Sequence, residues 1–530
     1  MQPASSPEAP RHLRRFFLIG ILLEVVLIAL GFFLPESWLQ VEARNLLMVT
    51  HFPLMLLMED LRFGDSVDFT ILCLPIGLIL MGAVWGFLIY LVTRPVKALM
   101  SRFCVSSRQK LIFRCGFGFV CLTILSWAIV STLPATPIPF TASPEVKSAI
   151  EGNTTFALDL YQKLKDQPGN LFFSPYSIST SLAMTYAGAR GETATQMAEV
   201  LHFDLGQTNL PTAFGALTAR MKQIQRWNRI TLKTANSLWG QTNHLFEKPF
   251  LNVIHKFYGA EAREVDFDHS PQAAADEING WVERKTDREI RDTIDPSQFT
   301  NLTRLVLCNA IYFKGKWQHQ FKVRDTKPAP FHVTTNETVT VPMMSQKGHF
   351  KMAFNDDDSL ELLELPYSGQ DLSMIILLPS GTEYYFPEAS HNDVYDLEQK
   401  LTPKNLRSWL AKLDRANPHE TWVALPRFTT TQSLNLVKEL KSLGLTSAFN
   451  YTANFSGMDG TTNLFVSKVI HKAFVKVDES GTEAAAVTLS LVKTKSMDDR
   501  FNVDHPFIFL IRDNGSGSIL FLGRIIDPTK

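Results

Sequence analysis

Three long apolar runs near the start of the chain constrain its fold more than any other feature. They cover residues 16–34, 69–93 and 115–133, and Glu24 is the one charged residue inside them. Each run is close to the roughly 20 residues that an α-helix needs to cross a bilayer. We therefore predict an all-α membrane segment over residues 1–133 with three transmembrane helices. A cleaved signal peptide is the alternative for the first run, although such a peptide has an apolar core of only about 7–15 residues.

The charges beside these runs predict the orientation of the segment. Three arginines precede the first run, and six lysines and arginines lie in the second connection, residues 94–114. Glutamate and aspartate dominate the first connection, residues 35–68. Since connections rich in Lys and Arg stay in the cytoplasm, the N-terminus is predicted to be cytoplasmic. Everything after residue 133 then lies on the extracellular or periplasmic side of a multi-pass protein that has the lipid bilayer as a partner.

The charge balance and the cysteines exclude several classes of function. The 530 residues carry 52 Lys+Arg and 52 Asp+Glu. Neither the region up to Pro144 nor the rest of the chain is basic enough to predict a nucleic-acid partner. Cys308 is the only cysteine after residue 133, so a disulfide framework is excluded there and we expect this thiol to be a small buried apolar group. The cysteines show no metal-binding spacing, and the chain has no nucleophile elbow or phosphate-binding loop. We therefore predict no metal, no cofactor and no enzymatic activity.

A change in composition after residue 133 marks a linker and a separate domain. Residues 134–144 are rich in Pro, Thr and Ala and predict a short, stiff stalk. Apolar residues then recur at helical spacing from Val146 to Leu164, with Ser143 as the expected cap. Residues 145–530 mix helical and strand-like patterns without a repeat, which predicts one α/β domain. The helical patterns cover residues 194–201, 273–286, 394–401, 405–414 and 434–443, and the strand-like runs cover 304–313, 360–365, 372–378, 422–428, 474–477, 507–511 and 519–526.

One segment late in the chain has the pattern of a strand that lacks a partner. Between Gly481 and Lys495, one face of the alternation carries no charged or large residue, and Pro is absent. That face comprises Thr482, Ala484, Ala486, Thr488, Ser490 and Val492. Because a sheet can admit such a face while Glu483 on the other face stays in water, we predict that the segment is exposed at first and becomes a central strand later. The lysine at its end offers a site for proteolysis.

Five segments, in order along the chain, resemble landmarks of the serpins. They are residues 170–178, 309–317, 425–428, 478–486 and 501–511, which read NLFFSPYSI, NAIYFKGKW, LPRF, DESGTEAAA and FNVDHPFIFLI. The resemblance covers the region from Pro144 to Lys530. It implies a mixed α/β fold of three β-sheets with eight or nine helices and an exposed reactive-centre loop. In serpins this loop is cut by a protease and then inserts into the main sheet.

The resemblance also implies roles for particular residues. The scissile bond matches Lys495–Ser496, with Lys493–Thr494 and Arg500–Phe501 as rival bonds. Three further groups of the family are a hinge before this bond, a polar shutter beneath the strands that must part, and a breach at their upper end. The hinge positions are Glu479, Gly481, Thr482, Glu483, Ala484, Ala485 and Ala486; the shutter positions are Ser174, Ser177, Asn309 and His471; the breach positions are Trp317, Arg427 and Glu479.

The predicted function is a membrane-anchored inhibitor, acting as a monomer, that traps a serine protease as an acyl-enzyme. A lysine at the scissile position suits the acidic specificity pocket of trypsin-like proteases. The alternative is a non-inhibitory serpin that serves as a membrane-tethered binding or sensing module, although the small, neutral hinge residues favour inhibition. A separate basic group, Arg220, Lys222, Arg226 and Arg229, could attract a polyanion, and a solvated helix face is the simpler interpretation of it.

Overall fold

The structure is a computed structural model that describes residues 139–228, 230–242, 245–380, 394–481 and 499–530. The three predicted spans, the hinge residues 482–486 and the bond between residues 495 and 496 lie outside this set. The chain divides into two units, Met1–Leu133 and Pro134–Lys530, and the described residues belong to the second unit. Among the described residues, no helix is both long enough and apolar enough to cross a membrane.

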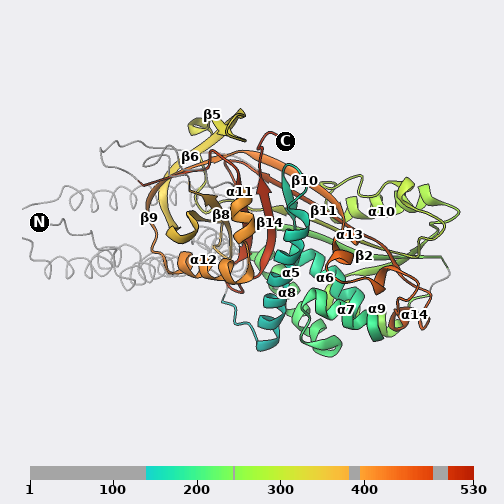
Figure 1. The fold of residues 1–530 in the computed structure, drawn as a ribbon. Coiled ribbons are helices and arrows are strands. Elements are labelled where there is room, and N and C mark those ends of the chain that lie inside the picture. The colour runs from blue at the N-terminus through green and yellow to red at the C-terminus, as the bar shows by residue number, and fades with distance from the viewer. Residues whose placement is uncertain (1–138, 229, 243–244, 381–393, 482–498) are drawn as a thin grey trace, which may run out of the picture. The chain divides into compact units, whose positions relative to one another are not determined.

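A five-stranded sheet lies at the centre of the second unit (Figure 1). Its strands follow the order β10 (Phe428–Asn435), β11 (Val466–Val477), β4 (Leu305–Lys314), β2 (Thr231–Gln241) and β3 (Glu261–Val265). The neighbouring strands β11 and β4 run parallel to each other. β10 pairs antiparallel with β11, and β2 pairs antiparallel with β4. Nine of the ten residues of β4 are buried, because both faces of this sheet are covered. Its near-continuous apolar sequence is the pattern that a strand buried on both faces requires.

The other nine strands form a second sheet, in which one long strand pairs with three neighbouring strands. β6 (Thr338–Asn355) pairs with β5 (Lys327–His332) and β9 (His419–Pro426) along its first part and with β7 (Leu360–Pro366) along its last residues. This continuity explains why the described residues form two sheets where three were expected. The remaining strands are β1 (Leu171–Phe173), β8 (Leu372–Pro379), β12 (Asp499–Asn502), β13 (Phe507–Asp513) and β14 (Ile519–Ile525).

Helices cover the two faces of the five-stranded sheet (Figure 1). On one face α10 (Pro271–Lys285) packs Ile278 and Trp281 against residues of β2 and β4, among them Trp239. On the other face α6 (Pro175–Tyr186) packs between this sheet and β14 within the main core. The described residues contain ten α-helices, where eight or nine were expected. The others are α5 (Pro144–Leu164), α7 (Gly191–Leu201), α8 (Gly206–Asn228), α9 (Lys248–Val253), α11 (Val394–Lys400), α12 (Pro403–Arg415), α13 (Val437–Ser442) and α14 (Ser456–Asp459).

The end of the expected stalk is part of the domain. The Ser143 hydroxyl accepts a hydrogen bond from the Val146 N–H at 3.3 Å, which confirms Ser143 as the cap of α5. Phe140 and Ala142 pack against the main core, and the Phe140 ring lies 5.3 Å from the guanidinium carbon of Arg220. The domain therefore begins before residue 144, the last residue of the expected stalk.

The interpretation of Arg220 as part of a solvated helix face is wrong. Its guanidinium has no exposed side-chain area and lies 2.6 Å from the Asp371 carboxylate and 3.0 Å from the Asp513 carboxylate. A buried charge is tolerated only with such partners. Arg220 therefore joins α8 to the ends of two strands of the larger sheet and is not available to a polyanion.

Candidate functional site

A buried polar cluster spans the seam between β4 and β11. His471 of β11 and Asn309 of β4 are direct partners in the parallel register, and Asn236 of β2 is the partner of Asn309 on its other side. Ser174 and Ser177, at the start of α6, lie beneath these strands, where Ser174 caps the helix by accepting from the Ser177 N–H at 3.1 Å. The structure thus brings the four predicted shutter residues together, and the term shutter cluster is used below for these four.

The hydrogen bonds around His471 assign its tautomer. The Ser174 backbone N–H donates to Nε2 of His471 at 3.0 Å, so Nε2 carries no proton. Nδ1 then holds the proton and donates to Oδ1 of Asn309. Because the ring has no exposed area, burial lowers the pKa of His471 to about 3. The imidazole is therefore neutral at physiological pH.

The side-chain amide of Asn309 completes the connection between sheet and helix. Its nitrogen donates to the Ser177 hydroxyl at 2.5 Å and to Oδ1 of the Asn236 side chain. A strand that entered between β4 and β11 would separate Asn309 from His471 and break this network. Losing the partner of a buried polar group costs about 1–3 kcal/mol. The shutter cluster can therefore hold the seam closed, and Asn236 belongs to the same network although no sequence motif marked it.

A second group of contacts joins the carboxyl ends of the same two strands. Trp317 follows β4 and is buried, and its indole N–H donates to the Asp478 carbonyl at 3.0 Å just after β11. The Trp317 backbone N–H donates to the Ser480 carbonyl at 3.0 Å. The indole also stacks on Tyr367, with ring centroids 4.7 Å apart. The predicted breach residue thus fastens the chain immediately before the predicted hinge.

Glu479 is held by an ion pair and by a hydroxyl. Nε of Arg427 donates to the Glu479 carboxylate at 2.8 Å, and the Thr326 hydroxyl donates to the same oxygen. The side chain of Glu479 is 6% exposed and that of Arg427 is 39% exposed. Burial works against ionisation of Glu479, but the hydrogen bonds from Arg427 and Thr326 outweigh it and lower the pKa of this carboxyl. Because Arg427 is partly solvated, the pair contributes modestly to stability.

Gly481 occupies the point where the described chain leaves the breach. Its φ is +130°, a conformation that other residues rarely adopt. A Cβ atom there would lie 2.2 Å from the Gly315 carbonyl oxygen and 2.5 Å from the Trp317 nitrogen. These neighbours are backbone atoms and cannot move aside as a side chain would. Close approach of two backbones therefore requires glycine at the first small residue of the predicted hinge.

The structure describes some of the remaining predicted residues, and others lie outside the described ranges. Cys308, beside Asn309, is buried, and burial raises the pKa of its thiol to about 12, as expected for an apolar structural cysteine. Arg500 lies in β12 and is exposed. Within the described ranges, no group of three or more metal-ligating side chains comes together. The hinge from Thr482 onward, Lys493 and the bond Lys495–Ser496 lie outside the described residues.

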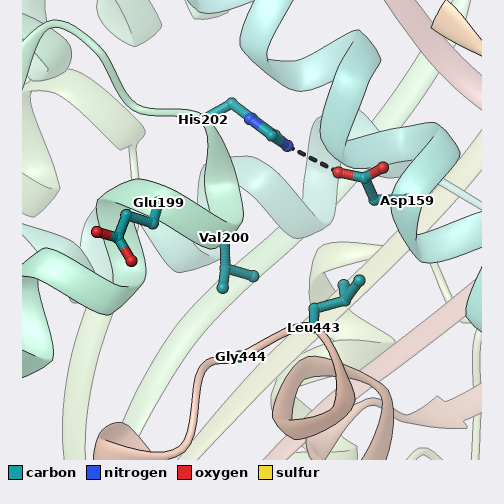
Figure 2. A pocket seen from close by; sticks show the side chains of 6 residues that line it. All are labelled: Asp159, Glu199, Val200, His202, Leu443 and Gly444. Carbon is teal, nitrogen blue, oxygen red and sulfur yellow. Dashed lines mark hydrogen bonds and ion pairs between the residues drawn. The ribbon is translucent and has the colours of Figure 1, made fainter.

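A small surface hollow lies away from the shutter cluster and the breach (Figure 2). Its lining comes from α5, α7 and the turn after α13, and His202 lies 2.7 Å from the Asp159 carboxylate at its edge. The side chains of His202 and Asp159 are both more than one third exposed. This pair connects the end of α7 to α5 and involves none of the predicted site residues.

Comparisons with known proteins agree with the geometry of the seam. The profile of one family, described as serpin (serine protease inhibitor), matches residues 151–528. The bovine leukocyte elastase inhibitor is 43% identical over 380 residues, which cover 71% of this chain and 98% of that protein. A serpin-like protein of Thermococcus kodakarensis is 40% identical over 75% of this chain and 90% of its own length. A solved structure of a highly specific serpin from Tenebrio molitor covers 73% of this chain and 100% of its own, with a TM-score of 0.64 and 33% identity.

Proposed function

The chain belongs to the serpin family of serine protease inhibitors, and from that premise we propose that it traps a trypsin-like protease after cleavage at Lys495–Ser496. The observation that carries the proposal is the seam itself. Two parallel strands, β11 and β4, are held together on one side by the shutter cluster and at one end by the breach. The exposed segment predicted from the sequence begins directly after that end, at Gly481.

The first step is acylation of the protease. The protease serine attacks the Lys495 carbonyl carbon, the amide bond to Ser496 breaks, and the new amino group of Ser496 leaves with a proton. An ester then joins the protease serine to Lys495. In the serpin family the freed segment enters the main sheet before water hydrolyses this ester, which traps the enzyme.

The strand directions support insertion between β11 and β4. β11 ends at Val477 and the chain turns at Asp478–Gly481, where the Gly481 N–H donates to the Asp478 carbonyl. A segment that folds back from this turn runs antiparallel to both strands. One parallel pairing is then replaced by two antiparallel pairings, and antiparallel pairs are slightly more stable per residue. Fifteen inserted residues at about 3.3 Å each would carry the attached protease roughly 50 Å.

The identity of the scissile residue favours trypsin-like enzymes over elastases. Several relatives are named leukocyte elastase inhibitors, and the specificity pocket of elastase is small. Lys495 is long and positively charged, and it matches a pocket with a carboxylate at its base. The rival bonds Lys493–Thr494 and Arg500–Phe501 also follow basic residues. All three candidate bonds therefore support the same class of target.

A complex that survives denaturation tests this proposal. The full-length chain in detergent micelles is incubated with trypsin and, separately, with leukocyte elastase, and the products are boiled in SDS and separated by size. A covalent complex with trypsin is expected, and mass spectrometry of the released fragment identifies the bond that was cut. Thr482→Arg places a charge on the face that must enter the sheet, so cleavage should continue while the complex disappears. Cleavage of the wild type without any complex would instead favour a binding or sensing module.

Membrane anchoring is a separate part of the proposal. It rests on the three apolar runs at residues 16–34, 69–93 and 115–133, whose lengths fit a bilayer. The inhibitory domain would then act on proteases at the extracellular or periplasmic surface. Membranes from expressing cells should retain the chain through alkaline carbonate extraction, and protease added outside should reach the domain. Release by carbonate would contradict anchoring without affecting the inhibitory mechanism.

A further inference from the structure

An exposed tryptophan lies between two cationic side chains on the strands next to the reactive segment. In the register of the larger sheet, Lys347 of β6, Trp422 of β9 and Arg500 of β12 are direct neighbours. Cross-strand partners project from the same face of a sheet. Trp422 is 41% exposed although Thr421 and Val423 on either side of it are buried. These three residues are called the Trp422 row below.

Chain length places the Trp422 row close to the proposed scissile bond. Arg500 follows Ser496 by four residues, so the two α-carbons are at most about 14 Å apart whatever path the chain takes. Trp422 is one strand farther, about 5 Å more. A protease–inhibitor interface of standard size covers about 800 Å² per partner, which is a disc of about 16 Å radius around the bond. The upper bound for Arg500 is within that radius, and the upper bound for Trp422, about 19 Å, exceeds it by only about 3 Å.

The local charges favour a protease over a bilayer as the occupant of this surface. The Glu420 carboxylate lies 3.1 Å from Nζ of Lys347, and the Asp499 carboxylate lies 3.4 Å from His419. Lys347 is therefore paired with a carboxylate and Arg500 has Asp499 as its sequence neighbour, whereas attraction to an anionic membrane needs a surplus of positive charge. Tryptophan and arginine are among the residues most enriched at positions that dominate protein–protein binding energy.

We propose that the Trp422 row is a secondary contact surface for the target protease and determines which trypsin-like enzymes are trapped quickly. The inference rests on the proposed function, since it requires a protease bound at Lys495. The matching enzyme offers an apolar recess for the Trp422 ring beside the active-site cleft, with a carboxylate within reach of Arg500. Specificity then depends on this contact as well as on Lys495.

Trp422→Ala tests the contact surface, with Tyr451→Ala as the matched control. Tyr451 is 75% exposed and precedes α14, which Figure 1 shows at the opposite end of the domain from β9. Association rate constants and inhibition stoichiometries are measured for full-length wild type and both variants with trypsin, thrombin and plasmin. Trp422→Ala should slow the fastest of these reactions about fivefold or more, which is the loss typical of an interface residue that contributes substantially to binding. Its stoichiometry and thermal unfolding temperature should not change, and Tyr451→Ala should behave as wild type.

The same rates measured in micelles and in nanodiscs of anionic lipid distinguish the two possible occupants. A protease contact predicts an equal loss in both, whereas a loss confined to nanodiscs would assign the surface to the bilayer and overturn the inference. Unchanged rates for every protease that the wild type traps would also overturn it while leaving the proposed function intact. A wild type that traps none of the three proteases would contradict both the proposed function and the role of the Trp422 row.

Discussion

The neutral state of His471 makes the stability of the domain depend on pH in one direction. Burial lowers the pKa of this ring to about 3, whereas a histidine in an unfolded chain titrates near 6.5. Between these two values the unfolded chain binds a proton that the folded chain does not. Stability is therefore complete above about pH 6.5 and falls as the pH drops toward 3. For this group alone the loss between pH 7.5 and pH 5 is about 2 kcal/mol.

Urea unfolding of the wild type and of His471→Gln isolates this contribution. Glutamine can donate and accept hydrogen bonds but does not titrate, so the other ionisable groups cancel when the two proteins are compared. Unfolding free energies are obtained from tryptophan fluorescence at pH 7.5 and pH 5. We expect the wild type to lose about 2 kcal/mol more than the variant over this interval. Equal losses in the two proteins would refute the assignment of His471 as a neutral, buried donor to Asn309.

Three further predictions concern other residues of the domain. Gly481→Ala places a Cβ 2.2 Å from the Gly315 carbonyl oxygen at a backbone φ of +130°, so it should lower the free energy of unfolding of the uncut protein by about 1–3 kcal/mol. An unchanged thermal unfolding temperature would contradict the close approach. Because burial raises the pKa of Cys308 to about 12, peptide mass spectrometry should find it unlabelled by iodoacetamide at pH 8 until urea unfolds the domain, and rapid native labelling would be inconsistent with this. Both ring nitrogens of His505 donate, one to Asp504 and one to a backbone carbonyl; burial opposes its charge, but these bonds outweigh burial and raise its pKa. Stability should therefore fall more in wild type than in His505→Gln as urea unfolding is moved from pH 6 to pH 9, and parallel curves would count against an imidazolium.

Short strands with mostly apolar sequences could be predicted almost to their bounds, whereas a long strand interrupted by several lysines could not. The runs at 360–365 and 372–378 are confirmed as β7 and β8. β11 begins at Val466 although the pattern indicated a strand only from Phe474. Lysines interrupt this strand, and Lys472 reaches outward so that its ammonium donates to the carbonyl of Asp292 at 2.9 Å. A lysine whose charged end binds outside the sheet is compatible with a buried strand, but the sequence alone does not indicate that partner.

The candidate site was predictable mainly because the landmark segments contain most of its residues, and the resemblance supplied His471 as well. The five landmark segments contain the shutter residues Ser174, Ser177 and Asn309, and the structure places them together with His471. Asn236 joins the same network through the register of β2 and β4, which no local pattern encodes. The two carboxylate partners of Arg220 lie 151 and 293 residues away in sequence. Contacts over such distances depend on the assembled fold, and this is why the solvated interpretation of Arg220 failed.

The proposed mechanism requires that the uncut domain keep a seam into which its own reactive segment can enter. Circular dichroism can compare the thermal unfolding of the intact protein with that of the protein cut once at Lys495. If the segment becomes the sixth strand between β11 and β4, the cut protein should unfold at a higher temperature than the intact one, and Thr482→Arg should abolish the increase. A cut protein that unfolds at the same temperature as the intact protein would show that no insertion follows cleavage and would rule out the trapping mechanism.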